Sequence, residues 1–280
     1  MSAGAEIGVF GGSGFYSFLD DVTSVAVDTP YGPPSAPVAL GTVGGRRVAF
    51  LARHGVDHSL GPGRVNYRAN VWAMRSLGVR RLLGPCAVGS LRPDVHPGDF
   101  VVCDQLVDRT SGRSDTFFDA DAPVHLSFAD PYCPELRSAV IGAASSSGSS
   151  GPSGSSGSSG IRCHPTGTVV VIQGPRFSTR AESQWYRSAG FDVINMTQYP
   201  EAYLAREVGI CYAAIALVTD YDTGVEGEPG VGPVTMDEVF AVLRDNVDRT
   251  RELLMRVIPS VPEVAACACH EALSSGPLGT

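Results

Sequence analysis

Two carboxylates directly follow a long apolar run of this sequence. The run from Cys211 to Thr219 is rich in Ala, Ile and Val, and Asp220 and Asp222 come after it. Such a run is typical of a buried strand, on which side chains two residues apart project to the same side. Neighbouring carboxylates raise each other's proton affinity, so one can hold a proton near neutral pH while the other accepts hydrogen bonds. This pair can protonate a purine ring nitrogen and accept from an exocyclic amine, although a solvated turn or a cation site has the same pattern.

A guanidinium and an imidazole stand together at the end of another apolar run. Arg53-His54-Gly55 follows the strand-like residues Arg47 to Leu51. An arginine fork beside a histidine suits a tetrahedral oxyanion. Because the protein is acidic, a phosphate-sized ligand is favoured over a polyanion. A surface arginine beside a structural histidine is the alternative.

A glycine-rich turn follows the first apolar run of the chain. In Gly11-Gly12-Ser13-Gly14 the backbone N–H groups can approach an anion, and the Ser13 hydroxyl adds a donor. A dinucleotide-binding fingerprint also begins in this way. Only Phe15 to Val22 separates the turn from the next strand-like stretch, however, which is too short for a crossover of ten or more residues. A tight turn without a ligand is the remaining alternative.

Other motifs give weaker signals. Phe177, in Gly174-Pro175-Arg176-Phe177-Ser178, can stack on a base, although a phenylalanine near a strand end is usually part of the core. Cys267-Ala268-Cys269-His270 has metal-binding residue types but no second ligand group at zinc spacing, so no metal site is predicted. The sequence has no Gly-x-Ser-x-Gly elbow and no His-Glu-x-x-His pair, which removes the commonest hydrolase signatures.

The composition limits the partners and the compartment. The formal charge of -8, from 29 acidic and 21 basic residues, repels nucleic-acid phosphates and anionic membranes. Seven cysteines without secretory spacing indicate a reducing compartment. No basic leader begins the sequence, and no apolar stretch reaches the ~18 residues of a membrane span. These features predict a cytoplasmic protein without nucleic-acid or membrane partners.

The elements that must position these residues alternate between strands and helices. The predicted strands are Glu6 to Phe10, Arg47 to Leu51, Thr166 to Gln173, Asp192 to Met196 and Cys211 to Thr219, with a further apolar run from Arg81 to Leu83 that leads into Cys86 to Ser90. The predicted helices are Tyr67 to Leu77, Glu182 to Ala189, Pro200 to Val208 and Met236 to Ile258. This order predicts an α/β fold, a single domain over residues 1–264 with a mixed, twisted central β-sheet flanked by helices. The Ser/Gly-rich residues 142–160 are predicted to be a flexible surface insertion, and residues 265–280 a poorly ordered tail.

A series of ordered motifs carries a family resemblance. They are Gly11–Gly14, Asp28–Gly32, Leu51–Gly55, Val65–Asn70, Gly89–Leu91, Asp104–Thr110, Gly174–Ser178, Asn195–Thr197 and Thr219–Asp222. Together they resemble the 5'-methylthioadenosine phosphorylases of the purine nucleoside phosphorylase family. The resemblance runs from Ile7 to about Leu254 and is interrupted by the Ser/Gly insertion.

The resemblance implies a role for each matching residue. The implied phosphate pocket consists of Ser13, Arg53, His54, Cys86 with the Ala87 backbone, and Thr197. Met196 would meet the ribose hydroxyls, Phe177 would face the base, and Ser178, Asp220 and Asp222 would read its polar edge. The implied 5' pocket is lined by Met236, Val239 and Phe240, with His125 lent across a subunit interface of a homotrimer. Cys86 departs from the family, because many relatives carry a threonine there.

The activity implied is the phosphorolysis of S-methyl-5'-thioadenosine to adenine and 5-methylthioribose 1-phosphate, a purine and methionine salvage reaction. Asp220 would act as the general acid, with inorganic phosphate as co-substrate and no metal or organic cofactor. Alternatives within the enzyme class are a phosphorylase for other 5'-modified adenosines (5'-deoxy or 5'-halogeno), one for inosine-type nucleosides, and a hydrolytic nucleosidase. Two alternatives lie outside this class of enzymes: a dinucleotide-binding oxidoreductase and a non-catalytic nucleoside-binding module.

Overall fold

A computed structural model describes residues 4–11, 19–119, 124–146, 162–228, 231 and 236–275, with the backbone alone described at 236–246 and 272–275. The strands of these residues form one sheet in the order β2-β3-β4-β1-β5-β10-β9-β7, and β11, β6 and β8 branch from β5. The strands are β1 (Ile7–Gly11), β2 (Asp20–Val25), β3 (Val38–Val43), β4 (Arg46–Ala52), β5 (Arg81–Ser90), β6 (Phe100–Val101), β7 (Gln105–Arg109), β8 (Cys163–His164), β9 (Thr168–Ile172), β10 (Val193–Asn195) and β11 (Cys211–Tyr221). Strand β5 pairs in parallel with β1 and β11 and antiparallel with β10, so the sheet is mixed, as predicted.

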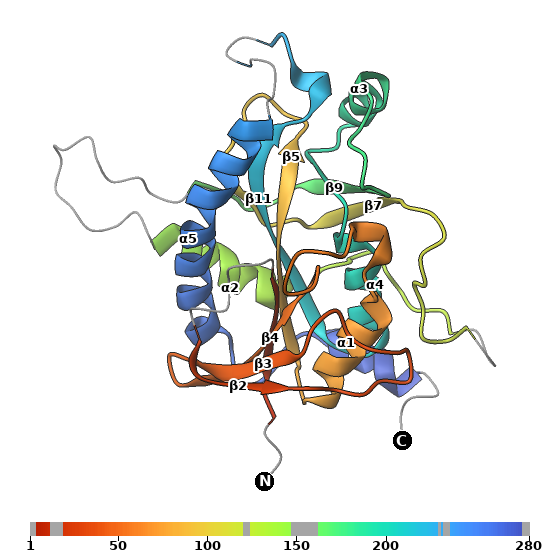
Figure 1. Ribbon diagram of the computed structural model, residues 1–280, viewed down its shortest axis with the longest axis vertical. Coiled ribbons are helices and arrows are strands. Elements are labelled where there is room, and N and C mark those ends of the chain that lie inside the picture. The colour runs from red at the N-terminus through yellow and green to blue at the C-terminus, as the bar shows by residue number, and fades with distance from the viewer. Residues whose placement is uncertain are drawn as a thin grey trace, which may run out of the picture.

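Helices cover both faces of this sheet. The helices are α1 (Tyr67–Ser76), α2 (Pro134–Ser145), α3 (Arg180–Ser188), α4 (Gln198–Glu207) and α5 (Met236–Ser260), with short 3-10 helices η2 (Pro62–Arg64), η4 (Thr223–Val225) and η5 (Ala268–Ser275). Helices α1 and α4 pack on one side of β5 and β11, whereas α2 and α5 pack on the other (Figure 1). Each side therefore has its own hydrophobic core.

Strand β11 shows why the apolar run is continuous. Tyr212, Ala214 and Ala216 point into the core under α1 and α4, and the alternate residues Cys211 and Ala213 point into the core under α2 and α5. A strand covered on both faces has no solvent side, so it reads as a run of apolar residues rather than as an alternation. Its carboxyl end, where the two aspartates lie, is the first part that leaves the core.

Two of the predicted boundaries are wrong. Helix α2 continues through Ser145, so residues 142–145 are helical and not part of the insertion, because Ala143 and Ala144 pack into the core. The predicted tail contains η5, and Cys269 is only 3% exposed because it packs into the core under α2 and α5. Residues 147–161 and the last five residues lie outside the described residues. In the part of the chain that the structure describes, no helix is long and apolar enough to cross a membrane.

Candidate active site

Strands β5 and β11 carry residues from both parts of the predicted site, the phosphate residue Cys86 and the acid Asp220. Their parallel register sets Cys86 beside Ala216 and Gly89 beside Asp220. Between Val218 and Asp220 the register shifts by one residue, which is a β-bulge. Two of the predicted phosphate residues, Cys86 and Ala87, therefore lie on the strand next to the one that bears the predicted acid.

Gly89 makes room for the two aspartates. A Cβ atom at this position would lie 3.3 Å from Asp220 Oδ2, 3.5 Å from Asp222 Cβ and 3.0 Å from Ile194 Cγ2. The Asp222 N–H donates to the Ser90 carbonyl at 2.8 Å, which holds the second aspartate at the same end of β5. The structure thus brings Asp220 and Asp222 together around the bare backbone of Gly89.

Burial alters the protonation of this pair. The pKa of Asp220 is raised from 3.8 to about 6, chiefly by burial and to a smaller extent by the neighbouring Asp222 charge, although a hydrogen bond from Thr219 at 2.6 Å opposes the shift. Burial also raises the pKa of Asp222. Asp220 therefore holds a proton for part of the time near neutral pH, as a general acid must.

Two buried polar atoms near the aspartates have no hydrogen-bond partner among the described residues. They are Asp222 Oδ2 and Ser178 Oγ. An unpaired buried polar group costs about 1–3 kcal/mol, so these two atoms, on side chains that face each other, are available to bind a polar ligand. Ser178 precedes the capping box of α3, in which Thr179 and Glu182 exchange hydrogen bonds. Phe177, next to it, is 58% exposed and not part of the core.

At the other end of the site, Arg53 is held rigidly by an internal carboxylate. Its Nε and Nη2 donate to Glu201 at 2.6 and 2.8 Å, and its Nη1 donates to the Pro85 carbonyl at 3.0 Å. Glu201, on α4, is fully buried and also accepts from the Tyr212 hydroxyl at 2.6 Å. These bonds use three of the five guanidinium donors and leave two for an anion beside Cys86.

His54 is neutral in this environment. Burial, and then the adjacent Arg53 charge, lowers its pKa from 6.5 to about 4. Its Nδ1 lies 2.8 Å from the Leu60 carbonyl. Because a carbonyl only accepts, Nδ1 carries the ring proton, and Nε2 is left as an acceptor. His54 can therefore accept a hydrogen bond from a protonated phosphate oxygen.

The side-chain amide of Asn195 connects two of the residues predicted to bind phosphate, Ala87 and Thr197. Asn195 Nδ2 donates to the Ala87 carbonyl at 2.9 Å, and Asn195 Oδ1 accepts from the backbone N–H of Thr197 at 2.7 Å. Gln198 Nε2 contacts Cys86 Sγ at 3.4 Å. Burial raises the pKa of Cys86 to about 11, so it is a thiol that lacks the hydroxyl donor of a threonine. Asn195 and Gln198 thus connect the segment that carries Thr197 to Ala87 and Cys86.

The structure describes the side chains of only two of the other predicted residues, Met196 and His125. Met196 is half-buried and packs on Gly174, where a Cβ atom would lie 2.6 Å from its sulfur. His125 is exposed, and no hydrogen bond joins its side chain to another described residue. Ser13 lies outside the described residues, as do the side chains of the three residues predicted to line the 5' pocket, Met236, Val239 and Phe240.

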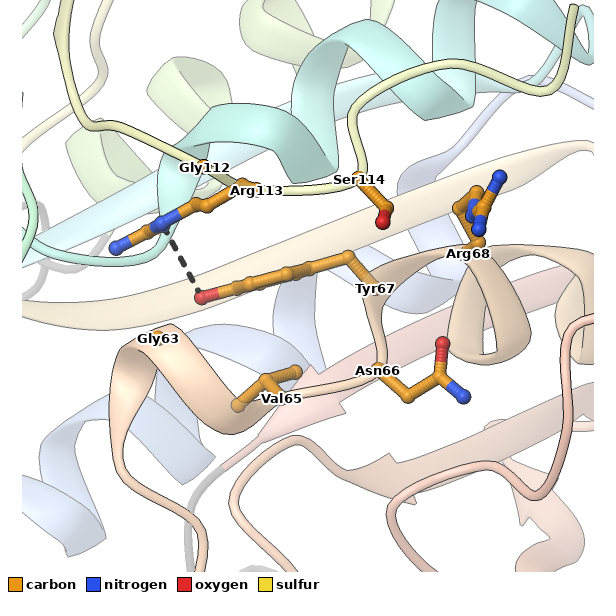
Figure 2. Close-up of a pocket in the computed structure, with 8 residues that line it drawn as sticks. All are labelled: Gly63, Val65, Asn66, Tyr67, Arg68, Gly112, Arg113 and Ser114. Atoms are coloured by element: carbon orange, nitrogen blue, oxygen red, sulfur yellow. Dashed lines mark hydrogen bonds between the residues drawn. The ribbon is translucent and has the colours of Figure 1, made fainter. Parts of the chain in front are cut away.

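A cavity of about 160 Å³ lies next to Met196 but contains none of the predicted site residues. It is lined by Gly63, Val65, Asn66, Tyr67, Arg68, Gly112, Arg113 and Ser114 (Figure 2). The Arg113 guanidinium donates to the Tyr67 hydroxyl at 3.4 Å and to the Met196 carbonyl at 2.9 Å. Arg113 therefore positions the Met196 backbone.

The sequence reasoning missed Glu201 and Arg113. Both act through residues that are distant in the chain, and no local pattern signals such contacts. The only hint is that Glu201 stands next to the apolar residues Pro200 and Ala202, where a charge needs a buried partner.

Residues 6–259 match the family model described as the phosphorylase superfamily. The chain belongs to this superfamily. It is 54% identical to the S-methyl-5'-thioadenosine phosphorylase of Mycolicibacterium smegmatis, with 96% of each chain covered. It is 52% identical to a purine nucleoside phosphorylase of Streptomyces coelicolor, over 96% of this chain and 94% of the other. A methylthioadenosine phosphorylase from Schistosoma mansoni, solved in complex with adenine, superposes with a TM-score of 0.86 at 36% identity, over 98% of this chain and 99% of the other.

Proposed function

We propose that this superfamily member is an S-methyl-5'-thioadenosine phosphorylase, which transfers 5-methylthioribose from adenine to inorganic phosphate. The observation that carries the proposal is the buried carboxyl of Asp220, with its pKa of about 6, on the strand next to the one that bears Cys86 and Ala87. An acid for the leaving base thus lies near residues suited to an oxyanion. The names of the Mycolicibacterium and Schistosoma relatives support the same substrate.

The proposed reaction divides between the two ends of the site. Phosphate, held by Arg53, His54 and the backbone around Ala87, attacks the anomeric carbon, and the bond from that carbon to purine N9 breaks. Asp220 donates its proton to N7 of the departing base, so adenine leaves neutral, and solvent later returns the proton. Positioned proton transfer contributes about 10²–10⁴ in rate, and fixing phosphate beside the sugar removes much of the entropic barrier.

Recognition of the base falls to the buried atoms that lack partners. Asp222 Oδ2 can accept from the 6-amino group, and Ser178 Oγ can donate to or accept from the same polar edge. An ionised carboxylate repels a 6-carbonyl oxygen, which favours adenine-type over inosine-type substrates. The purine nucleoside phosphorylase named among the relatives makes the inosine-type activity the second candidate.

The assembly and the 5' pocket complete the proposal. We propose a homotrimer in which the exposed His125 of one subunit reaches the 5' substituent bound by another. Met236, Val239 and Phe240 at the start of α5 would supply the apolar part of that pocket. No metal or organic cofactor takes part in the chemistry.

A substrate panel tests the function. Purified protein would be given phosphate with S-methyl-5'-thioadenosine, adenosine, 5'-deoxyadenosine, a 5'-halogenoadenosine or inosine, and base release would be followed. We expect phosphate-dependent release of adenine, fastest from the methylthio compound. Base release without phosphate would indicate a nucleosidase, and faster inosine cleavage would replace the proposed substrate by the second candidate.

A further inference from the structure

Four cysteines from three distant parts of the chain meet at one point. They are Cys133, Cys211, Cys267 and Cys269, and their sulfur atoms all lie within 4.8 Å of one another. The Sγ of Cys267 lies 3.6 Å from that of Cys133 and 3.3 Å from that of Cys211. Three of the four are buried, Cys267 is half-buried, and all four are free thiols.

We propose that these four sulfurs bind one Zn²⁺ ion. Zinc takes four thiolates at about 2.3 Å in a tetrahedron, whose corners are then about 3.8 Å apart. The two separations of 3.6 and 3.3 Å from Cys267 are close to this value, and all four sulfurs lie within 4.8 Å of one another. A disulfide needs about 2.05 Å and uses each sulfur once, whereas Cys267 stands at similar distances from two sulfurs. That arrangement fits one shared centre better than two separate pairs.

Cys133 is held at the start of α2. It is the N-cap of this helix, and its sulfur accepts a hydrogen bond from the Leu136 N–H at 3.4 Å. Metal binding would release one proton from each thiol and requires no oxidant.

The other ligands lie on segments that are already fixed. Cys211 is the first residue of β11, and Cys267 and Cys269 flank the start of η5. Glu135 accepts from the Ala266 N–H at 3.2 Å, which ties the start of this C-terminal segment to α2. The ion would therefore join the C-terminal segment, β11 and α2.

The site is structural and separate from the candidate active site. It lies at the start of β11, and Asp220 lies nine residues further along the same strand, or about 30 Å at about 3.3 Å per residue. Four protein ligands leave no open position for a substrate or a water, which is typical of structural zinc.

Metal analysis of the full chain tests the proposal. Protein purified without chelators, with a reductant, would be desalted and its zinc measured by mass spectrometry. We expect about one zinc per chain, and loss of it in the double variant C267S/C269S. The matched control is C163S, which removes a half-buried thiol outside the cluster and should keep its zinc.

A second measurement covers the case in which the double variant does not fold. Wild-type protein refolded with Co²⁺ should show the charge-transfer and visible bands of tetrahedral thiolate coordination. In a separate preparation, wild-type protein purified without a reductant and alkylated without reduction should show no disulfide among the four cysteines. Less than half an equivalent of zinc after incubation with zinc chloride, two disulfides within the cluster, or absent cobalt bands would each overturn the proposal.

Discussion

Asp220→Asn removes the proposed proton donor and keeps the shape of the side chain. The carboxyl lies next to Gly89, where no other described side chain offers a proton at the same position, because Asp222 faces Ser178 and Ser183. The amide can still form a hydrogen bond but cannot give up a proton. We expect kcat to fall by about 10²–10⁴.

The pH profile gives the sign of the effect. The acid must be protonated, so kcat/KM should be highest below the pKa of about 6 and decline above it. It should be about tenfold below its plateau at pH 7 and about a hundredfold below at pH 8. In the Asn variant this decline should vanish, because the group that titrates is gone.

The free energy of unfolding of the Asp220→Asn variant shows whether a loss of activity comes from the missing acid or from a failure to fold. Asp220 binds its proton more tightly in the folded than in the unfolded chain, so near neutral pH the folded state carries a penalty of about 3 kcal/mol for ionising it. The Asn variant relieves that penalty and should unfold at an equal or higher urea concentration. Adenine release with saturating phosphate, measured from pH 5 to 9 on both proteins, is the assay. A stable variant within tenfold of wild-type turnover, or one with the same decline above pH 6, would refute the role of Asp220.

Three further changes test other parts of the site. Gly89→Ala sets a methyl group 3.3 Å from Asp220 Oδ2. It should lower kcat/KM about tenfold or more and cost about 1–3 kcal/mol of stability through overpacking. The control is Gly142→Ala, in open space on α2, and equal activity of the two variants would contradict the expectation. Glu201→Leu leaves the Arg53 charge buried without its partner and should lower the free energy of unfolding by about 3–5 kcal/mol, whereas a loss below about 1 kcal/mol in urea titration would show that the pair is unimportant. His54 has its pKa lowered to about 4 in the folded state, so the unfolded chain binds the proton first as the pH falls, and stability should drop by up to about 3 kcal/mol between pH 6.5 and 4. His54→Gln should remove that part of the pH dependence, and an unchanged unfolding profile would count against it.

Elements with a strong local pattern were predictable from the sequence. Strand β11 is apolar on both faces, and α1 has its apolar residues on one side, so both were predicted within two residues of their observed ends. Strand β5 was predicted only in part. Gly84 and Pro85 are typical of a turn, yet the strand continues through them because the side chain of Tyr212 fills the space above Gly84, where a Cβ atom would lie within 3 Å of the ring.

Contacts between distant segments could not be predicted. Arg53 and Asp220 follow or end strands β4 and β11, which run parallel through β1 and β5, so both lie at the carboxyl edge of the sheet; the sequence patterns alone do not show this strand order. The partner of Arg53 is 148 residues away, and nothing local distinguishes Glu201 from a surface glutamate. The cysteine cluster was missed for the same reason, since only Cys267 and Cys269 are neighbours in the sequence.

The length of β5 between Cys86 and Gly89 sets the distance between the two ends of the proposed site. Three residues of an extended chain cover about 10 Å, and a strand in the middle of a sheet cannot stretch or fold shorter. In the proposed arrangement the oxyanion binds beside Cys86 and the base beside Asp220, so a bound nucleoside must span this fixed distance. A substituent on the 5' carbon lies outside that span, and enzymes with the same strand can therefore differ in the 5' group that they accept.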